Sequence, residues 1–146
     1  MLRTFFLLAT ISFAMLTPQS FAQSQNQEEA EVAQQKAEEW LTFVDKGNYT
    51  ESWNQASPLF QQNVTEDQWS QVAKQLRDQL GELESREVQQ AQYTTSLPNA
   101  PEGEYVVVQY NSEFSNIDST VETVVMNKTE EGEWAAIGYS VPPPGQ

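Results

Sequence analysis

Val-Glu-Thr-Val-Val-Met, at residues 121–126, is the stretch that decides how the rest of the chain is arranged. Val and Thr branch at Cβ and favour an extended backbone, so this run predicts a β-strand. Its apolar side chains fall on both faces, which is typical of a central strand that is covered on both sides. Glu122 is the only carboxylate inside the run. We therefore expect Glu122 to have a charged partner or to line a pocket.

Three further strands are predicted around this one, which is expected to run from residue 120 to residue 127. Residues 86–96 alternate in a way that indicates a half-exposed edge strand, and residues 105–114 and 134–141 are rich in Val, Tyr and Trp. Turn-forming residues separate the segments, so neighbouring strands are expected to pair antiparallel in chain order. Strict alternation in the last strand predicts one face formed by Ala135, Ile137, Tyr139 and Val141.

The preceding part of the chain has a helical period. Residues 28–46 place apolar side chains three and four residues apart, which predicts a helix with one buried stripe. Residues 65–68, Thr-Glu-Asp-Gln, are a capping box and predict a helix over residues 66–80. Two short helices are expected in between, capped by Asn48 and Ser57. The apolar side of the helix over residues 66–80 is expected to consist of Trp69, Val72, Leu76 and Leu80.

The first 22 residues have the pattern of a secretory signal peptide. Arg3 gives a positive start, an uncharged apolar run extends over residues 5–16, and a cleavage position follows Ala22. The run is shorter than the roughly 20 residues that an ordinary transmembrane helix needs. The chain has no Cys, so no lipid anchor is expected. We therefore expect a periplasmic or secreted protein without a membrane span.

Residues 23–146 have a length that suits one domain, in which the Pro-rich residues 142–146 form an extended tail. The whole chain has a formal net charge of −14, and such an acidic surface argues against binding to nucleic acid or anionic lipid. Because the sequence contains neither His nor Cys, it lacks the commonest metal ligands, the commonest general base and thiol chemistry. No metal and no cofactor is therefore expected.

Helices followed by strands, without alternation of the two, indicate an α+β fold in which N-terminal helices pack on one face of a four-stranded antiparallel sheet. Aromatic and glycine residues in this arrangement also resemble a known family. The matching positions are Trp40, residues 45–49, Ser52-Trp53, Gln68-Trp69, Arg77, Gly81, Arg86, Gly103, Tyr105, Phe114, residues 121–123, Trp134 and Gly138-Tyr139. The chain resembles an uncharacterised family of exported bacterial domains, the four-thousand-and-nineteenth of the numbered domains of unknown function, over nearly all of residues 23–146.

That family is similar to the nuclear-transport-factor-2-like (NTF2-like) and cystatin-like α+β folds. The resemblance implies a curved sheet that wraps a long helix and can leave a cone-shaped cavity. It implies no reaction, because the family has no assigned activity and the fold hosts enzymes, binding modules and dimerisation units. Enzymes of this fold, such as ketosteroid isomerase, place acid and base side chains inside the cone. No position of this chain is identified with one of those catalytic residues.

Glu122 has three interpretations. It shares a strand face with Val124 and Met126, where an unpaired carboxylate is costly. In the preferred interpretation, Glu122 forms a structural bridge to Arg86 or Arg77, because a guanidinium can bind a carboxylate with two hydrogen bonds. The alternatives are a carboxylate that lines a pocket and a solvated position on an exposed face of the sheet.

Tyr110 and Tyr139 are the other candidate site residues. If both faced a cavity, their hydroxyls could donate to a ligand carbonyl while Glu122 accepts a proton, which is the minimum for a weak acid-base enzyme. The interpretation that we favour is that both rings belong to the core. The three glutamates in residues 130–133 lack the spacing of a calcium loop and indicate a solvated turn.

The sequence leaves three classes of function. The preferred class is a non-enzymatic exported domain that binds a small apolar molecule or a partner protein through the curved sheet and its cavity. The second is a structural module that forms a homodimer through the aromatic-rich sheet. The third is the weak acid-base enzyme that uses Glu122 with Tyr110 and Tyr139.

Overall fold

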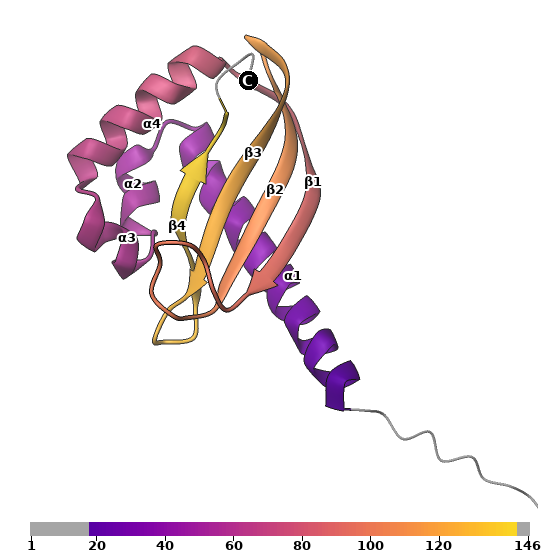
Figure 1. Ribbon diagram of the computed structural model, residues 1–146. Helices are drawn as coiled ribbons and strands as arrows, with labels where there is room; N and C mark the ends of the chain where they lie inside the picture. Colours follow the sequence, from indigo (N-terminus) through magenta and orange to yellow (C-terminus); the bar gives the residue numbers. More distant parts are fainter. Residues whose placement is uncertain (1–17, 143–146) are drawn as a thin grey trace, which may run out of the picture.

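The computed structural model describes residues 18–142 of the chain (Figure 1). The predicted α+β class, with a four-stranded antiparallel sheet, is confirmed for this part of the chain. The elements are α1 (Pro18–Asp45), α2 (Tyr49–Asn54), α3 (Pro58–Asn63), α4 (Glu66–Leu80), β1 (Leu83–Thr94), β2 (Tyr105–Phe114), β3 (Ile117–Lys128) and β4 (Trp134–Ser140).

The sheet is curved and open, with its strands in the order β1-β2-β3-β4 (Figure 1). Every neighbouring pair is antiparallel, because short connections return the chain beside the strand that it has just left. α1 crosses the inner face of the sheet, while α2, α3 and α4 lie to the side of β4. β1 is an edge strand, as its half-exposed alternation predicted.

α1 begins at Pro18, earlier than the start at residue 28 that the apolar stripe predicted. Its N-terminal part extends beyond the sheet (Figure 1), and residues 21–28 are exposed. After this exposed stretch, Ala30 is the first buried residue, at 6% exposure. Packing against the sheet therefore begins where the predicted stripe begins. Most of the predicted signal peptide, residues 1–17, and the last residues of the predicted tail, 143–146, lie outside the described residues.

α4 has the bounds that the capping box predicted. The Gln68 amide donates to Thr65 Oγ1 at 3.3 Å, and the Thr65 amide donates to Gln68 Oε1 at 3.0 Å. One predicted position of the apolar side is wrong, because Val72 is 59% exposed whereas Ala73 and Arg77 are buried. The buried stripe of α4 therefore carries a guanidinium into the interior.

β3 turns only one of its faces to the core. Glu122, Val124 and Met126 are buried, whereas Val121 and Val125 on the opposite face are half-buried. The prediction that this strand is covered on both sides is therefore wrong for the outer face. Its apolar residues on both faces reflect a position inside the sheet, and no part of residues 18–142 forms a second layer over the outer face (Figure 1).

β4 contains a β-bulge that changes which residues share a face. The register shifts at Ile137, which has no partner on β3. Trp134 and Ala136 are consequently buried on the side from which Tyr139 reaches the core. The predicted strict alternation placed Ala135 and Ile137 on the same face as Tyr139. This prediction is wrong, because strict alternation does not allow for the extra residue that the bulge inserts into the strand.

An aromatic cluster fills the space between α1, α4 and the inner face of the sheet. The ring centroid of Trp40 lies 5.7 Å from that of Trp69 and 6.0 Å from that of Tyr139. Buried Ser52 of α2 accepts from both indoles: Trp40 Nε1 donates to its carbonyl oxygen at 2.7 Å, and Trp69 Nε1 donates to its Oγ at 2.8 Å. These bonds satisfy the polar tips of rings that are otherwise apolar.

Candidate functional site

Glu122 is completely buried on the inner face of β3. Arg86 of β1 donates to both of its carboxylate oxygens, from Nε at 2.5 Å and from Nη2 at 2.9 Å. Ser112 of β2 donates from Oγ at 2.9 Å, and the Tyr139 hydroxyl of β4 donates at 2.6 Å. Glu122 therefore accepts hydrogen bonds from each of the three other strands.

Asp45, the last residue of α1, is a second carboxylate in this cluster. Arg86 Nη1 and Nη2 donate to it at 2.7 Å and 2.9 Å, so one guanidinium bridges Asp45 and Glu122 with four hydrogen bonds. The sequence-based site did not include Asp45. The helical spacing could have indicated that Asp45 faces the core, because Asp45 follows the buried Leu41 by four residues and so lies on the buried side of α1.

Arg77 reaches the cluster from α4. Its Nη1 lies 3.2 Å from Asp45 Oδ1 and 3.9 Å from Glu122 Oε1, and its side chain is 8% exposed. The guanidinium carbon lies 4.8 Å from the centroid of the Phe114 ring, which is a cation–π contact. Nη1 is buried and has no acceptor in hydrogen-bonding geometry within the described residues. Arg77 therefore balances the charge of the two carboxylates while Arg86 supplies the well-formed bonds.

The surroundings hold Arg86 and Tyr139 in fixed protonation states. Burial by itself would lower the pKa of Arg86, but the hydrogen bonds with Asp45 and Glu122 raise that pKa above its ordinary value. Burial raises the pKa of Tyr139, and the charge of the Glu122 carboxylate raises it further. Arg86 therefore stays charged and Tyr139 stays protonated at neutral pH.

Tyr110 differs from Tyr139 although both rings lie in the interior. Its hydroxyl is buried and has no hydrogen-bond partner among the described residues. Burial raises the pKa of Tyr110, and the ring centroid lies 5.9 Å from the guanidinium carbon of Arg86. The structure thus brings Glu122, Arg77, Arg86 and Tyr139 together in one cluster and places Tyr110 beside it.

The cluster leaves Glu122 no free side for chemistry. An ionised carboxylate has about four lone-pair sites, and four donors from Arg86, Ser112 and Tyr139 point at the two oxygens of Glu122. The side chain has no exposed surface. This geometry ties four strands and the end of α1 together, and it offers no position from which a substrate proton could reach Glu122.

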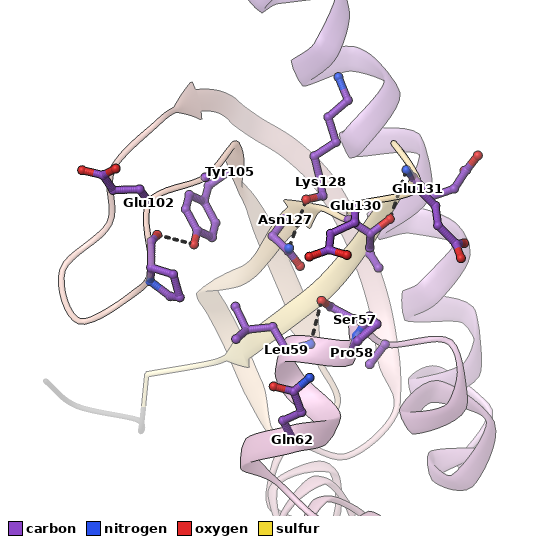
Figure 2. A pocket seen from close by; sticks show the side chains of 16 residues that line it. Ser57, Pro58, Leu59, Gln62, Glu102, Tyr105, Asn127, Lys128, Glu130 and Glu131 are labelled. Atoms are coloured by element: carbon purple, nitrogen blue, oxygen red, sulfur yellow. Dashed lines mark hydrogen bonds between the residues drawn. The ribbon is translucent and has the colours of Figure 1, made fainter.

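A cavity of about 640 Å³ lies at the opposite end of the sheet, and we call it cavity A. It opens between the start of α3, residues 101–105 and the hairpin that joins β3 to β4. Tyr105 forms one side and donates from its hydroxyl to the Pro101 carbonyl at 2.6 Å, while Pro58 and Leu59 form the other (Figure 2). The volume lies within the range of about 300–1,000 Å³ that is usual for ligand pockets.

Asn127 is one of the polar residues that line cavity A, and it lies between Tyr105 and the start of α3 (Figure 2). Its Nδ2 donates to the Lys128 carbonyl at 3.2 Å, but its Oδ1 is buried and has no donor within the described part of the chain. The Lys128 ammonium is held by Glu29 at 2.6 Å. Carboxylates surround the opening of the cavity: Glu102, Glu130, Glu131 and Glu133.

The three hairpin glutamates are exposed, as expected for a turn, and they also line cavity A. Within residues 18–142, no group of three or more Asp, Glu, His or Cys side chains is placed to hold a metal ion. Cavity A therefore combines apolar side chains and four glutamates with one buried oxygen that lacks a donor among the described residues.

Comparison with protein-family models confirms one part of the resemblance, the domain of unknown function. No helix in the described range is both long enough and apolar enough to cross a membrane. The search of curated proteins found no match. The family model described as "Protein of unknown function (DUF4019)" matches residues 36–139, which include the whole charge cluster and all the residues that line cavity A. Because this match covers most of the sequence, the chain belongs to that family of proteins of unknown function.

Proposed function

We propose that this protein is an exported, non-enzymatic domain that binds a small molecule in cavity A. The observation that carries the proposal is the buried Oδ1 of Asn127, which has no donor within the described residues. Leaving a buried acceptor without a donor costs about 1–3 kcal/mol. A ligand that donates a hydrogen bond to this oxygen removes that cost and gains affinity from it.

The lining of cavity A favours a ligand with an apolar body and a cationic N–H group. Pro58, Leu59 and Tyr105 supply apolar and aromatic surface. The carboxylate of Glu102 and the three hairpin glutamates create a negative potential at the opening, which attracts a cation. A protonated amine attached to an apolar group satisfies both parts of the cavity.

The charge cluster supports a structural rather than a catalytic role for Glu122. A general base must approach the substrate proton to roughly 2.6–3.2 Å. Glu122 is completely buried and already accepts from Arg86, Ser112 and Tyr139. Its role in the proposal is to hold the sheet and α1 rigid while cavity A binds its ligand at the other end.

Titration with benzylammonium, followed by NMR of ¹⁵N-labelled protein, tests this proposal. We expect saturable shifts of the Asn127 side-chain amide and the Gly103 backbone amide. Uncharged benzyl alcohol should bind about five- to tenfold more weakly than benzylammonium, because a hydrogen bond from a charged donor is stronger than one from a neutral donor. Asn127→Ala should weaken benzylammonium binding by a similar factor. The same change at the exposed Asn111 of β2 is the matched control. Equal binding of amine and alcohol, or unchanged binding by Asn127→Ala, would contradict the proposal.

Export is the part of the proposal that rests on the N-terminal sequence. The exposure of residues 21–28 supports it, because cleavage after Ala22 would remove no buried side chain of α1 from the described core. N-terminal sequencing of the protein from the periplasm or medium should begin at Gln23. Recovery of the uncut chain in the cytoplasm alone would contradict export.

We include the NTF2-like or cystatin-like superfamily in the proposal. The curved antiparallel sheet around the long helix α1 supports this placement (Figure 1). An experimental structure in which α1 left the inner face of the sheet would contradict it.

A second candidate function is binding of a partner protein or a second copy of the chain through the outer face of the sheet. Val107 and Val125 are directly paired there, and Val121 lies on the same face; all three are only half-buried. Adjacent apolar side chains on an open sheet face favour a contact surface. Light scattering distinguishes the homodimer, since a strict monomer at high protein concentration would contradict it.

A further inference from the structure

A second cavity, of about 760 Å³, lies at the end of the sheet away from cavity A, and we call it cavity B. It is bounded by the end of α1, the start of α2, the end of α4 and the beginning of β1. Arg77 and Asp45 belong to its wall, so the charge cluster and cavity B share these two residues. Lys46, Tyr49 and Gly81 line the same space.

Arg77 retains hydrogen-bonding capacity that the cluster does not use. Arg86 donates four hydrogen bonds to Asp45 and Glu122, whereas Nη1 of Arg77 lies 3.2 Å from Asp45 Oδ1 and forms no hydrogen bond in good geometry within residues 18–142. A guanidinium carries five N–H donors in a planar fork. The Arg77 side chain is more than nine-tenths buried, and the cation–π contact with Phe114 fixes its position. Arg77 also belongs to the wall of cavity B, so the N–H groups of its fork other than Nη1 are placed to take an external acceptor.

Two further donors stand in the same cavity. Burial raises the pKa of Tyr49, so its hydroxyl is protonated at neutral pH, and Arg77 is its strongest charged neighbour. Lys46 is exposed and forms no ion pair within the described part of the chain. Arg77, Tyr49 and Lys46 therefore offer a guanidinium, a hydroxyl and an ammonium to one ligand group.

We propose that cavity B binds a carboxylate group, held by the guanidinium of Arg77 together with the Tyr49 hydroxyl and the Lys46 ammonium. A planar carboxylate matches the fork of a guanidinium and accepts two parallel hydrogen bonds. Asp45, Asp78 and Glu82 also line the cavity. These acids repel a dianion such as phosphate more strongly than a monoanion, so the site selects carboxylates. The carboxylate belongs either to a small free acid or to the C-terminus of a peptide.

NMR titration of the ¹⁵N-labelled chain at constant ionic strength tests this site with three probes. Acetate represents the small acid, and N-acetyl-trialanine with a free C-terminus represents the peptide; the same peptide with an amidated C-terminus is the control. Acetate and the peptide with a free C-terminus should both produce saturable shifts of the Arg77 Nε–H signal and of the Gly47 and Gly81 amide signals. The probe that binds more tightly shows whether the site takes a small acid or the C-terminus of a peptide. Equal shifts from the amidated peptide or from chloride, or tighter binding of phosphate than of acetate, would overturn the proposal.

Variants that leave Arg77 in place keep this test independent of its part in the cluster. Tyr49→Phe removes one donor and should weaken binding of the tighter carboxylate about three- to tenfold, and Lys46→Gln should weaken it about twofold. Lys36→Gln removes an exposed charge on α1 away from cavity B and should change nothing. The Asn127 side-chain amide should not move, so the outcome is separate from that at cavity A. Unchanged binding in both Tyr49→Phe and Lys46→Gln would overturn the proposal.

Discussion

The Arg86 guanidinium donates to both carboxylate oxygens of Glu122, from Nε at 2.5 Å and from Nη2 at 2.9 Å. Arg86 lies on the edge strand β1 and Glu122 on β3, so this pair spans the intervening β2. The same guanidinium also binds Asp45 at the end of α1. A completely buried charge is tolerated only where donors of this kind surround it. The pair therefore fixes the sheet and the long helix relative to each other.

Replacement of Glu122 by Gln should lower the free energy of unfolding by about 3–5 kcal/mol, because it leaves two buried guanidiniums with one carboxylate. Urea denaturation followed by circular dichroism measures this loss. The same replacement at the exposed Glu113 of β2 is the control and should cost less than about 0.5 kcal/mol. A loss at Glu122 as small as that at Glu113 would show that the charge is not needed in the interior.

Buried Tyr110 and half-buried Tyr139 should respond differently to loss of the hydroxyl. Tyr139→Phe removes a hydrogen bond to the charged Glu122 and should cost about 1.5–3 kcal/mol. Tyr110→Phe removes a buried hydroxyl that has no partner among residues 18–142 and should be neutral or stabilising. Denaturation of the two variants side by side makes the comparison. Equal losses would mean that the Tyr110 hydroxyl has a partner or that the Tyr139 bond contributes nothing.

Stability should fall as the pH rises above about 10, the ordinary pKa of tyrosine in an unfolded chain. Burial raises the pKa of Tyr139 and of Tyr110, so the folded protein keeps protons that the unfolded chain releases. The stabilisation that comes from the raised tyrosine pKa is complete below about pH 10. It is lost as the pH rises toward the pKa of each tyrosine in the folded protein, with a slope of about 1.4 kcal/mol per pH unit for each tyrosine. Between about pH 10.5 and 11.5, the free energy of unfolding of Tyr139→Phe should fall less steeply than that of the wild type, by about 1.4 kcal/mol per pH unit. A slope identical to that of the wild type would contradict the burial of this hydroxyl.

Ser52→Ala should cost about 1–3 kcal/mol, because it leaves the buried indole N–H of Trp69 without its acceptor. Thermal or urea unfolding measures this loss of stability. Ser119→Ala, at an exposed position of β3, is the control and should hardly change the free energy of unfolding. If both serines tolerated the change equally, the indole would have another acceptor.

Gly81→Ala should destabilise the protein far more than Gly47→Ala, although both glycines have positive φ. At Gly81 a Cβ atom would lie 2.0 Å from Ser115 Oγ, and φ +83° with ψ −157° is a region that is open essentially to glycine alone. At Gly47 nothing lies within 4 Å of the added atom, so only the backbone penalty of about 1–2 kcal/mol remains. Similar losses in the two variants would mean that the chain around Ser115 moves aside freely.

Local sequence signals predicted the elements whose ends depend on nearby residues. The bounds of α4 follow from the capping box at Thr65 and Gln68, where each side chain bonds the other's backbone. The bounds of β2, Tyr105–Phe114, follow from β-branched and aromatic residues between turn-forming ones. In the site, apolar neighbours of Glu122 indicated a buried carboxylate, and Arg77 and Arg86 were the available partners.

Tertiary contacts decided the rest. The bulge at Ile137 depends on how β4 packs, so strict alternation mistook the faces of Trp134 and Ala136. The spacing from Leu41 placed Asp45 on the buried side of α1, but its partner Arg86 is set by the meeting of the end of α1 with β1 in space. Cavity A likewise combines three segments distant in the sequence, and the unsatisfied oxygen of Asn127 becomes visible only when they meet.

Binding of a small molecule in cavity A through Asn127 can be detected by native mass spectrometry of the protein, purified from the compartment in which it resides. We expect an added mass on the wild-type chain that disappears on denaturation, is absent from Asn127→Ala and is retained by Asn111→Ala. A wild-type chain with the same mass under native and denaturing conditions, or a ligand retained by Asn127→Ala, would contradict it.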